Sequence, residues 1–366
     1  MKSLTVVRLA LLLIGLVVPL AAARAQSYPP LWKSTSSYLP GDQVQEGGNV
    51  YRCIRPVTTP NQDPARIYTY WELAEVRAYT ILFIGVGEPF PNLSVAWAYG
   101  LNARIAPSAY LHFYVVTTHG AYLQTLPAGG FNLDHPFGAY ISIIGDSKAG
   151  NEFYVPTTSK GFFIDNGHVI SSLMNLRIIG SSNATDGVIA TSNAVIGLIS
   201  NCYINGFLTC LHVSNGGSIR CDNQVTFFGP EIPDWNTAVM AETSGRVSLA
   251  SGTTVDGGDN SKDFCVGLQA QTGGRIDAAS CTIETCSYCV FVTSMGTINV
   301  ASGTIQDGVY NFKAHSHGFI DANSVTIGGG GDNDVWCYDD SHISMIGYHG
   351  TATFAIGAGD GSVVGT

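Results

Sequence analysis

Three side chains near the C-terminus are of the types that proton abstraction from a sugar acid requires. Such a reaction needs a base to remove the proton beside a carboxylate and a cation to stabilise the negative charge. His315 or Tyr338 is the candidate base, and Lys313 is the candidate cation. Phe291 and Trp336 are candidate stacking surfaces for sugar rings. The alternative is an ordinary solvent-exposed sheet face that carries a few aromatic residues.

A second candidate site is a pair of carboxylates, Asp256 and Glu284. Glycoside hydrolysis uses two carboxyl groups at a defined separation. Both residues hold the same position in the repeat described below, so neighbouring coils would bring their backbones to about 5 Å. The Gly-His-Gly signature of polygalacturonases is absent from the sequence. Polar residues at the end of a strand are the alternative explanation.

Aromatic residues also gather between residues 30 and 75. The Pro40-Gly41-Asp42 and Glu46-Gly47-Gly48-Asn49 turns separate short aromatic segments, which predicts a compact three-stranded unit. Exposed rings stack well on sugars, and the candidates for this role are Trp32, Tyr51, Tyr68, Tyr70 and Trp71. At this size some rings must form the core. The sequence favours a core position for Trp32 and Tyr51 and leaves Tyr70 and Trp71 open.

The elements that position the C-terminal candidates form a repeat. One column of branched apolar residues runs through similar segments: Ile219, Val247, Ile276, Ile298, Ile320 and Ile343. The separations from Ile276 to Ile298 and from Ile298 to Ile320 are both 22 residues. A period of this size, with no helical pattern inside it, predicts a solenoid with one repeat per coil.

Alternation with period two assigns the residues of each coil to inward and outward lanes. A second strand in each coil has an inward apolar lane, which consists of Val255, Ile283, Ile305 and Ile327. Its outward lane is a threonine ladder of Thr254, Thr282, Thr304 and Thr326. Threonine suits a pleated, half-exposed surface, and the Gly- and Ser-rich links between strands are the expected corners.

The cysteines and one group of charged residues are explained by the fold rather than by chemistry. Cys221, Cys281 and Cys337 fall on inward lanes, while disulfides that involve Cys202, Cys210, Cys286 or Cys289 stay open. The group formed by Arg246, Arg275, Asp277 and Asp321 is interpreted as cross-coil ion pairs. No zinc pattern is completed around the cysteines. No metal or cofactor is expected, and Ca²⁺ is an alternative that no motif supports.

The first 25 residues predict a secretory signal peptide. Lys2 and Arg8 precede an apolar run from Leu9 to Leu20, and the small residues Ala23 and Ala25 indicate cleavage before Gln26. The run is too short for a membrane span. The sequence therefore predicts an exported chain without a membrane span. A net charge of −10 argues against a nucleic-acid partner, since phosphate contacts need clustered Lys and Arg.

The N-terminal unit resembles carbohydrate-binding modules of the chitin-binding type, similar to families 5 and 12. The matching elements are Trp32, Tyr38 with Gly41-Asp42-x-Val44, Gly48-x-x-Tyr51, and Pro64 with Trp71. The resemblance implies binding of chitin or cellulose by surface Trp and Tyr side chains. The same sheet also occurs in phage tail and virion proteins.

The rest of the chain resembles pectin-lyase-like right-handed parallel β-helix proteins. The matches are His119-Gly120-x-Tyr122, the His135-Pro136-x-Gly138 turn before Ile141, and the segment from Leu173 to Gly180. A mixed apolar segment from Ser94 is the expected opening helical cap. The resemblance implies the fold more than the activity, because this group contains pectate lyases, polygalacturonases and phage tailspikes.

The sequence thus predicts an all-β protein: a signal peptide over residues 1–25, a carbohydrate-binding-like module over 26–75 and a right-handed parallel β-helix over 76–366. The expected function is binding of a polysaccharide (chitin, cellulose or an acidic glycan) outside the cell or in the periplasm. Cleavage of that polysaccharide by a lyase or hydrolase reaction stays open. The alternative is a non-catalytic adhesin or a phage-tail-like fibre, for which a trimer is an open possibility.

Overall fold

The computed structural model describes residues 29–117, 120–222, 224–228, 236–257, 265–328, 334–350, 356–358 and 363–365. The signal peptide and the cleavage point before Gln26 lie outside these ranges, as does His119. Two compact units divide the chain, one ending at Ala74 and the other beginning at Glu75. No helix in the described ranges is long and apolar enough to cross a membrane.

The first unit contains the three expected strands: β1 (Gln43–Glu46), β2 (Asn49–Cys53) and β3 (Trp71–Val76). β1 and β2 form an antiparallel hairpin in which Glu46 faces Asn49, so Gly47 and Gly48 make the loop. Their φ angles are 54° and 86°, as a two-residue hairpin of the primed type requires. The last two residues of β3, Glu75 and Val76, belong to the second unit and pair there in parallel with β5 (Arg104–Ile105).

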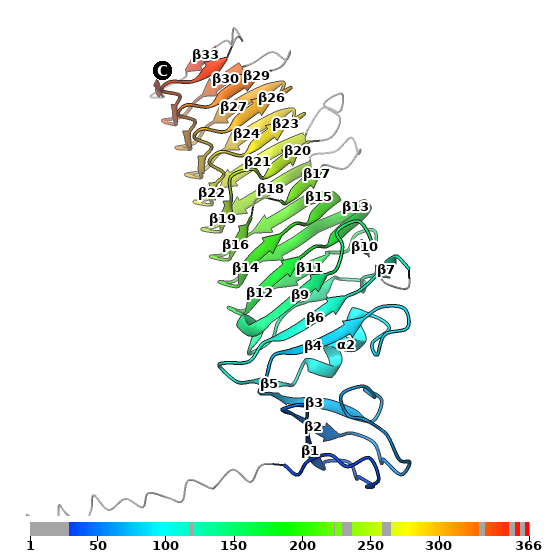
Figure 1. The fold of residues 1–366 in the computed structure, drawn as a ribbon. Helices are drawn as coiled ribbons and strands as arrows, with labels where there is room; N and C mark the ends of the chain where they lie inside the picture. The colour runs from blue at the N-terminus through cyan, green and yellow to red at the C-terminus, as the bar shows by residue number, and fades with distance from the viewer. Residues whose placement is uncertain are drawn as a thin grey trace, which may run out of the picture. The chain divides into compact units, whose positions relative to one another are not determined.

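The second unit is a stack of coils whose parallel strands form three faces (Figure 1). Face 1 is a 12-stranded ladder of β4 (Thr80–Ile84), β6 (Leu111–Val115), β9 (Ile141–Gly145), β12 (Val169–Met174), β14 (Val195–Ser200), β16 (Ser218–Cys221), β19 (Arg246–Leu249), β22 (Arg275–Asp277), β25 (Thr297–Asn299), β28 (Phe319–Asp321), β31 (His342–Ser344) and β34 (Val363–Gly365).

The other two faces are joined into one 18-stranded sheet. Face 2 contains β7 (Tyr122–Thr125), β10 (Asn151–Val155), β17 (Thr226–Phe228), β20 (Thr254–Asp256), β23 (Thr282–Glu284), β26 (Thr304–Gln306), β29 (Thr326–Gly328) and β32 (His349–Gly350). Face 3 contains β8 (Phe131–Asn132), β11 (Phe162–Ile164), β18 (Asn236–Glu242), β21 (Cys265–Gln271), β24 (Tyr288–Val292), β27 (Tyr310–Ala314), β30 (Asp334–Cys337) and β33 (Ile356–Ala358).

Two long strands join these faces. The first residues of β13 (Arg177–Ala190) pair with β10 and its last residues pair with β11. β15 (Tyr203–Val213) follows β13 through both faces and then pairs with β17 and β18. The unit is therefore the parallel β-helix that the repeat predicts. The general preference for right-handed crossovers between parallel strands agrees with the right-handed form that the resemblance implies.

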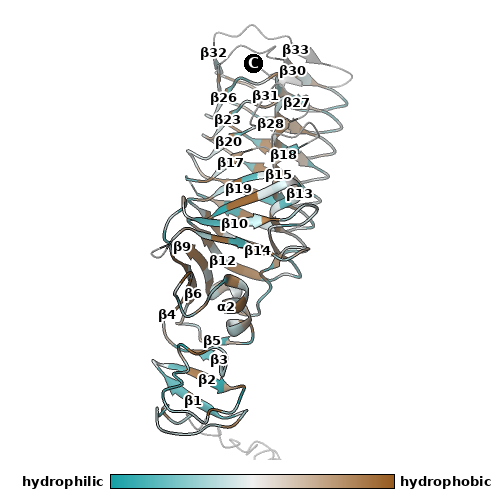
Figure 2. Ribbon diagram, turned by 90° about the vertical axis from the view of Figure 1, so that its right-hand side faces the viewer, coloured by the Kyte–Doolittle hydropathy of each residue, from teal (hydrophilic) through white to brown (hydrophobic). Residues whose placement is uncertain are grey.

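The register of the strands confirms the apolar column. Each member of the column from Ile219 to Ile343 faces the next one on the adjacent strand of face 1. All are buried. The threonine ladder from Thr254 to Thr326 is likewise in register on face 2. Hydrophobic segments are visible on β6, β9, β12 and α2 (Leu93–Gly100) in Figure 2.

The corner between face 3 and face 1 explains the recurring glycine. The chain turns there through two residues with positive φ, such as Ser294 (51°) and Met295 (64°). The next residue lies against the preceding coil, and a Cβ on Gly274 would lie 2.1 Å from the carbonyl oxygen of Ala241. Gly217, Gly245, Gly274, Gly296 and Gly318 hold this position. At these five positions glycine allows the close approach of two backbones, whereas Ala194 and Ser341 hold the same corner position in other coils.

The predicted helical segment near Ser94 is present as α2. Asn92 caps its N-terminus, since its Oδ1 accepts a hydrogen bond from the backbone N–H of Val95 at 3.0 Å. Trp97 on this helix contacts Phe113 and Phe131, with ring centroids 5.1 Å and 5.7 Å apart. The helix therefore covers the apolar interior of the first coils.

Two interpretations from the sequence concern side-chain pairing. All nine cysteines are buried and free, so none of the disulfides left open is formed in this structure. The cross-coil ion pairs expected for Arg246 and Arg275 are wrong. Arg246 faces Arg275 in the register of β19 and β22, and Asp277 accepts a hydrogen bond from Asn299 instead.

Candidate functional site

The outward lane of face 3 brings together the residues proposed for chemistry. Phe291, Lys313 and Trp336 are register partners on β24, β27 and β30. His315 and Tyr338 lie two residues further along the same coils. Five residues line a hollow of about 160 Å³, and we call them the aromatic–lysine site: Tyr288, Tyr310, Lys313, Trp336 and Tyr338.

The lysine of this site is held against aromatic rings. Its Nζ lies 5.1 Å from the ring centroid of Tyr288 and 5.6 Å from that of Phe291. Tyr288 stacks on Tyr310 at 4.9 Å between centroids. Cation–π contacts of this kind stabilise a positive charge without pairing it with a carboxylate. The ammonium group thus lies among aromatic rings on this part of face 3 and makes no ion pair with a described residue.

The next coil adds two further rings. Trp336 stacks on Tyr338 with 5.7 Å between centroids and 20° between planes. Both side chains are partly exposed. The Nε1 of Trp336 is buried without a hydrogen-bond partner in the described part of the chain. A buried indole N–H normally has an acceptor, so a hydroxyl oxygen of a bound ligand would satisfy it.

Sequence reasoning missed Tyr288 and Tyr310. Both are outward on face 3, where they face one another in the register of β24 and β27. The signal was present in the sequence, because the two tyrosines have the same 22-residue separation as Ile276 and Ile298.

His315 lies beside the site rather than in the lining of its hollow. Its ring is 5.6 Å from that of Phe291, and its Nδ1 lies 2.9 Å from the Oγ of Ser316. Burial lowers the pKa of His315, and the nearby charge of Lys313 lowers it further, while Asp339 opposes this shift. The imidazole is therefore neutral at pH 7 and able to accept a proton.

The alternative carboxylate pair lies on face 2. Asp256 and Glu284 are register partners on β20 and β23, as their positions in the repeat predict. Both carboxylates accept hydrogen bonds from neighbouring coils, Asp256 from Thr285 and Glu284 from Gln306. The structure brings the two residues together, on a different face from the aromatic–lysine site.

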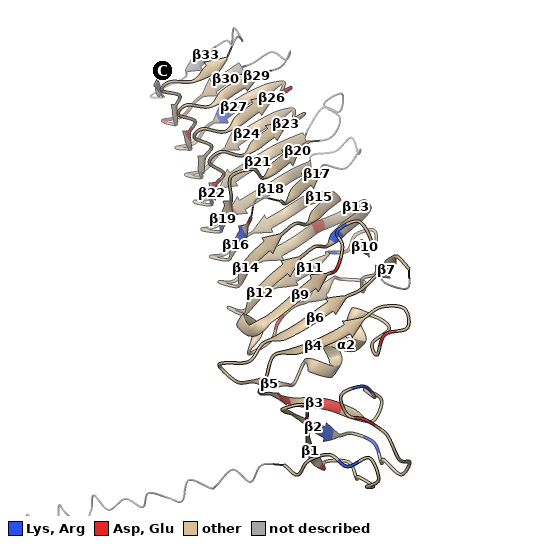
Figure 3. Cartoon of the chain, in the orientation of Figure 1, with Lys and Arg blue, Asp and Glu red and all other residues tan. Residues whose placement is uncertain are grey.

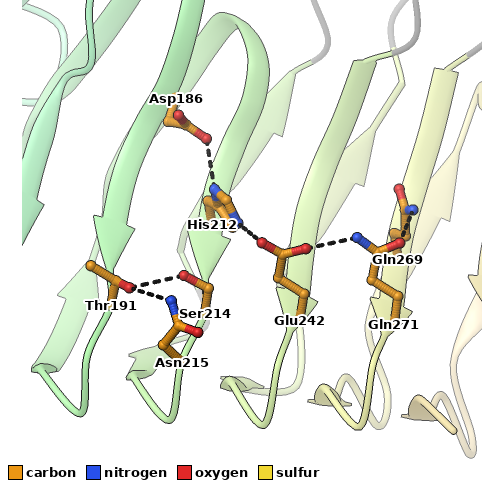
Figure 4. A network of polar contacts seen from close by, with 8 residues as sticks. All are labelled: Asp186, Thr191, His212, Ser214, Asn215, Glu242, Gln269 and Gln271. Carbon is orange, nitrogen blue, oxygen red and sulfur yellow. Dashed lines mark hydrogen bonds and ion pairs between the residues drawn. The ribbon is translucent and has the colours of Figure 1, made fainter. Parts of the chain in front are cut away.

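A longer polar network crosses face 3 nearer to the N-terminus (Figure 4). His212 connects two carboxylates, since its Nδ1 lies 2.9 Å from Asp186 and its Nε2 lies 3.2 Å from Glu242. The Nε2 of Gln271 donates to Glu242 at 2.7 Å. Burial by itself would lower the pKa of His212, but hydrogen bonds and charges from Asp186 and Glu242 outweigh it and raise that pKa.

The proposed sugar-stacking residues of the first unit divide into two groups. Trp71 is completely buried, donates from Nε1 to the carbonyl of Gln62 at 3.0 Å and packs against Tyr38. Tyr51 is also buried, and this burial raises its pKa. Both rings form the core, so neither offers a face to a sugar. Trp32, Tyr68 and Tyr70 are partly exposed, although the sequence favoured a core position for Trp32.

Comparison of the chain with family models, with curated proteins and with solved structures finds no match.

Proposed function

We propose that this chain is an exported protein that binds a polysaccharide along face 3 of its β-helix. The observation that carries the proposal is the aromatic–lysine site, in which Lys313 and four aromatic rings gather on successive coils. The aromatic rings offer apolar surfaces that stack on the faces of sugars. The Tyr hydroxyl and Trp N–H groups can form hydrogen bonds with sugar hydroxyls. Successive coils lie about 4.8 Å apart, so this surface repeats along the axis of the β-helix as sugar residues repeat along an extended polysaccharide.

The first unit is proposed as a second, targeting contact with the polysaccharide. Trp32, Tyr68 and Tyr70 are its candidate contact residues, because their rings are partly exposed. Export rests on the signal peptide that the first 25 residues predict. Chitin, cellulose and acidic glycans are the candidate ligands, and the positive charge of Lys313 favours the acidic ones.

A second candidate function is cleavage of the bound glycan by a lyase reaction. The observation in its favour is the neutral His315 two residues from Lys313. In such a reaction the imidazole removes the proton beside a uronate carboxylate, and the ammonium group stabilises the charge that develops. A carbon–carbon double bond then forms in the uronate as the glycosidic C–O bond on the next carbon breaks, and the leaving oxygen takes a proton from water. Tyr338 is the alternative base.

One experiment separates these functions. The mature chain (residues 26–366) is incubated with chitin, cellulose, polygalacturonate and alginate, and both retention and cleavage are followed. Retention without new unsaturated uronates or reducing ends supports a binding protein. Unsaturated uronates that disappear in His315→Ala support the lyase. Absence of retention on every glycan contradicts the proposal.

A further inference from the structure

Face 1 carries a groove that the proposed site does not use. The groove has a volume of about 390 Å³ and crosses β14, β16, β19 and β22. Its polar lining consists of Arg220, Arg246, Arg275, Ser218, Ser248 and Asp277. The three arginines are exposed, and Figure 3 shows basic residues gathered on these strands. We call this feature the arginine groove.

Within the described ranges, the guanidinium groups of this groove have no partner in the protein. Among the described residues, Arg52, Arg77 and Arg177 each pair with a glutamate. The side chains of Arg220, Arg246 and Arg275 have neither an ion pair nor a hydrogen bond in the same part of the chain. Arg246 and Arg275 face each other directly in the register, and like charges directly opposite destabilise a sheet. A bound anion would remove this repulsion.

We propose that the arginine groove binds an extended anionic glycan through its carboxylate or sulfate groups. Arginine presents a planar fork of donors that matches such oxyanions in a bidentate manner. The groove extends over several coils, and a spacing of about 4.8 Å between coils presents Arg246 and Arg275 to successive units of an extended polymer. A single small ion would occupy only part of this length.

Charge and lining support this choice of ligand. The three arginines and one aspartate in the lining give a local charge of 3 − 1 = +2, whereas the whole chain has a net charge of −10. Of the described residues that line the groove, none is aromatic. Single-stranded nucleic acids are bound by stacking their bases on aromatic rings, and nothing in this groove offers such a surface. The small Ser218 and Ser248 leave room for sugar rings and supply hydroxyl groups.

The test compares two variants of the mature chain with the same change in net charge. Arg246→Gln/Arg275→Gln removes the facing arginines of the groove. Arg104→Gln/Lys160→Gln removes two exposed cations elsewhere in the second unit. Affinity electrophoresis in gels that contain heparin, polygalacturonate, neutral dextran or inorganic polyphosphate measures binding.

We expect the wild type and the control variant to bind heparin alike and the groove variant to bind it at least about tenfold more weakly. Equal binding by the two variants overturns the proposal. Binding of polyphosphate as tight as that of the glycans overturns the assignment to a glycan. Trp336→Ala changes the aromatic–lysine site and should keep the binding of heparin, so failure of the aromatic–lysine site and failure of the arginine groove give different results.

Discussion

Lys313 and Trp336 are register partners on β27 and β30, so a cation and an indole ring lie next to each other on adjacent coils of face 3. The side chain of Lys313 points toward the preceding coil, where its ammonium group lies over the rings of Tyr288 and Phe291. Trp336 instead stacks on Tyr338 of its own coil. Along the axis of the β-helix, the positive charge of Lys313 therefore comes first, and the stacked rings of Trp336 and Tyr338 come on the next coil.

Replacement of this lysine tests the role of its charge. We expect Lys313→Met to weaken binding of an acidic glycan about tenfold, because the variant keeps an apolar stem but loses the ammonium group. Lys313→Arg should retain most of the affinity, since a guanidinium also lies well over aromatic rings. Affinity electrophoresis in polygalacturonate measures both variants. Wild-type mobility of Lys313→Met would show that the charge does not contribute.

The His212 network predicts a pH-dependent contribution to stability. The pKa of His212 is raised in the folded state, so the folded state binds this proton more tightly than the unfolded state. The resulting stabilisation is fully present below the ordinary histidine pKa of about 6.5 and is lost as the pH rises through the folded-state pKa. We therefore expect His212→Asn to cost about 2 kcal/mol at pH 5 and less at pH 8.

Urea unfolding of the wild type and His212→Asn at both pH values measures this difference. His317→Asn is the matched control, because its side chain is 67% exposed. An equal loss of stability at pH 5 and pH 8 in His212→Asn would contradict a protonated His212 between the two carboxylates.

The corner glycines allow a matched pair of substitutions. A Cβ at position 274 would lie 2.1 Å from a backbone oxygen, whereas a Cβ at position 328 would have nothing within 4 Å. We expect Gly274→Ala to destabilise the β-helix by about 1–3 kcal/mol, as overpacking does. Gly328→Ala should be neutral or slightly stabilising. Thermal unfolding compares the two, and similar melting temperatures would exclude close coil contact at Gly274.

The β-helix was predictable because its core repeats. Ile276, Ile298 and Ile320 recur at a fixed spacing, and a column of this kind can be extended from one coil to the next without knowledge of the structure. The same counting placed Lys313 beside Trp336 and Asp256 beside Glu284, and the register confirms both pairs.

Other features were not accessible in this way. Asp186 belongs to β13, a long strand that replaces a regular corner, so the later repeats give no guide to its position. The facing pair of Arg246 and Arg275 was visible in the alignment of repeats, but the rule that charges pair led to the wrong partners. Burial of Trp71 depends on packing against Tyr38, which a sequence pattern of turns and strands does not specify.

The first unit offers a test that separates folding from binding. Trp71 is fully buried, and we expect Trp71→Ala to cost about 3–5 kcal/mol. Tyr70→Ala removes a partly exposed ring and should leave stability within about 0.5 kcal/mol while reducing retention on chitin or cellulose. Near-ultraviolet circular dichroism and a pull-down assay measure the two effects. Unchanged folding of Trp71→Ala would contradict its core position.

The most direct test of the central claim is a calorimetric titration of the mature chain with soluble fragments of a glycan that retains it. Trp336→Ala is compared with Tyr154→Ala, which removes a ring that is 39% exposed on face 2. Polysaccharide binding at the aromatic–lysine site predicts that Trp336→Ala raises the Kd at least about tenfold, or about 1.4 kcal/mol, and that Tyr154→Ala leaves it unchanged. Equal dissociation constants for the wild type and both variants would contradict binding at this site.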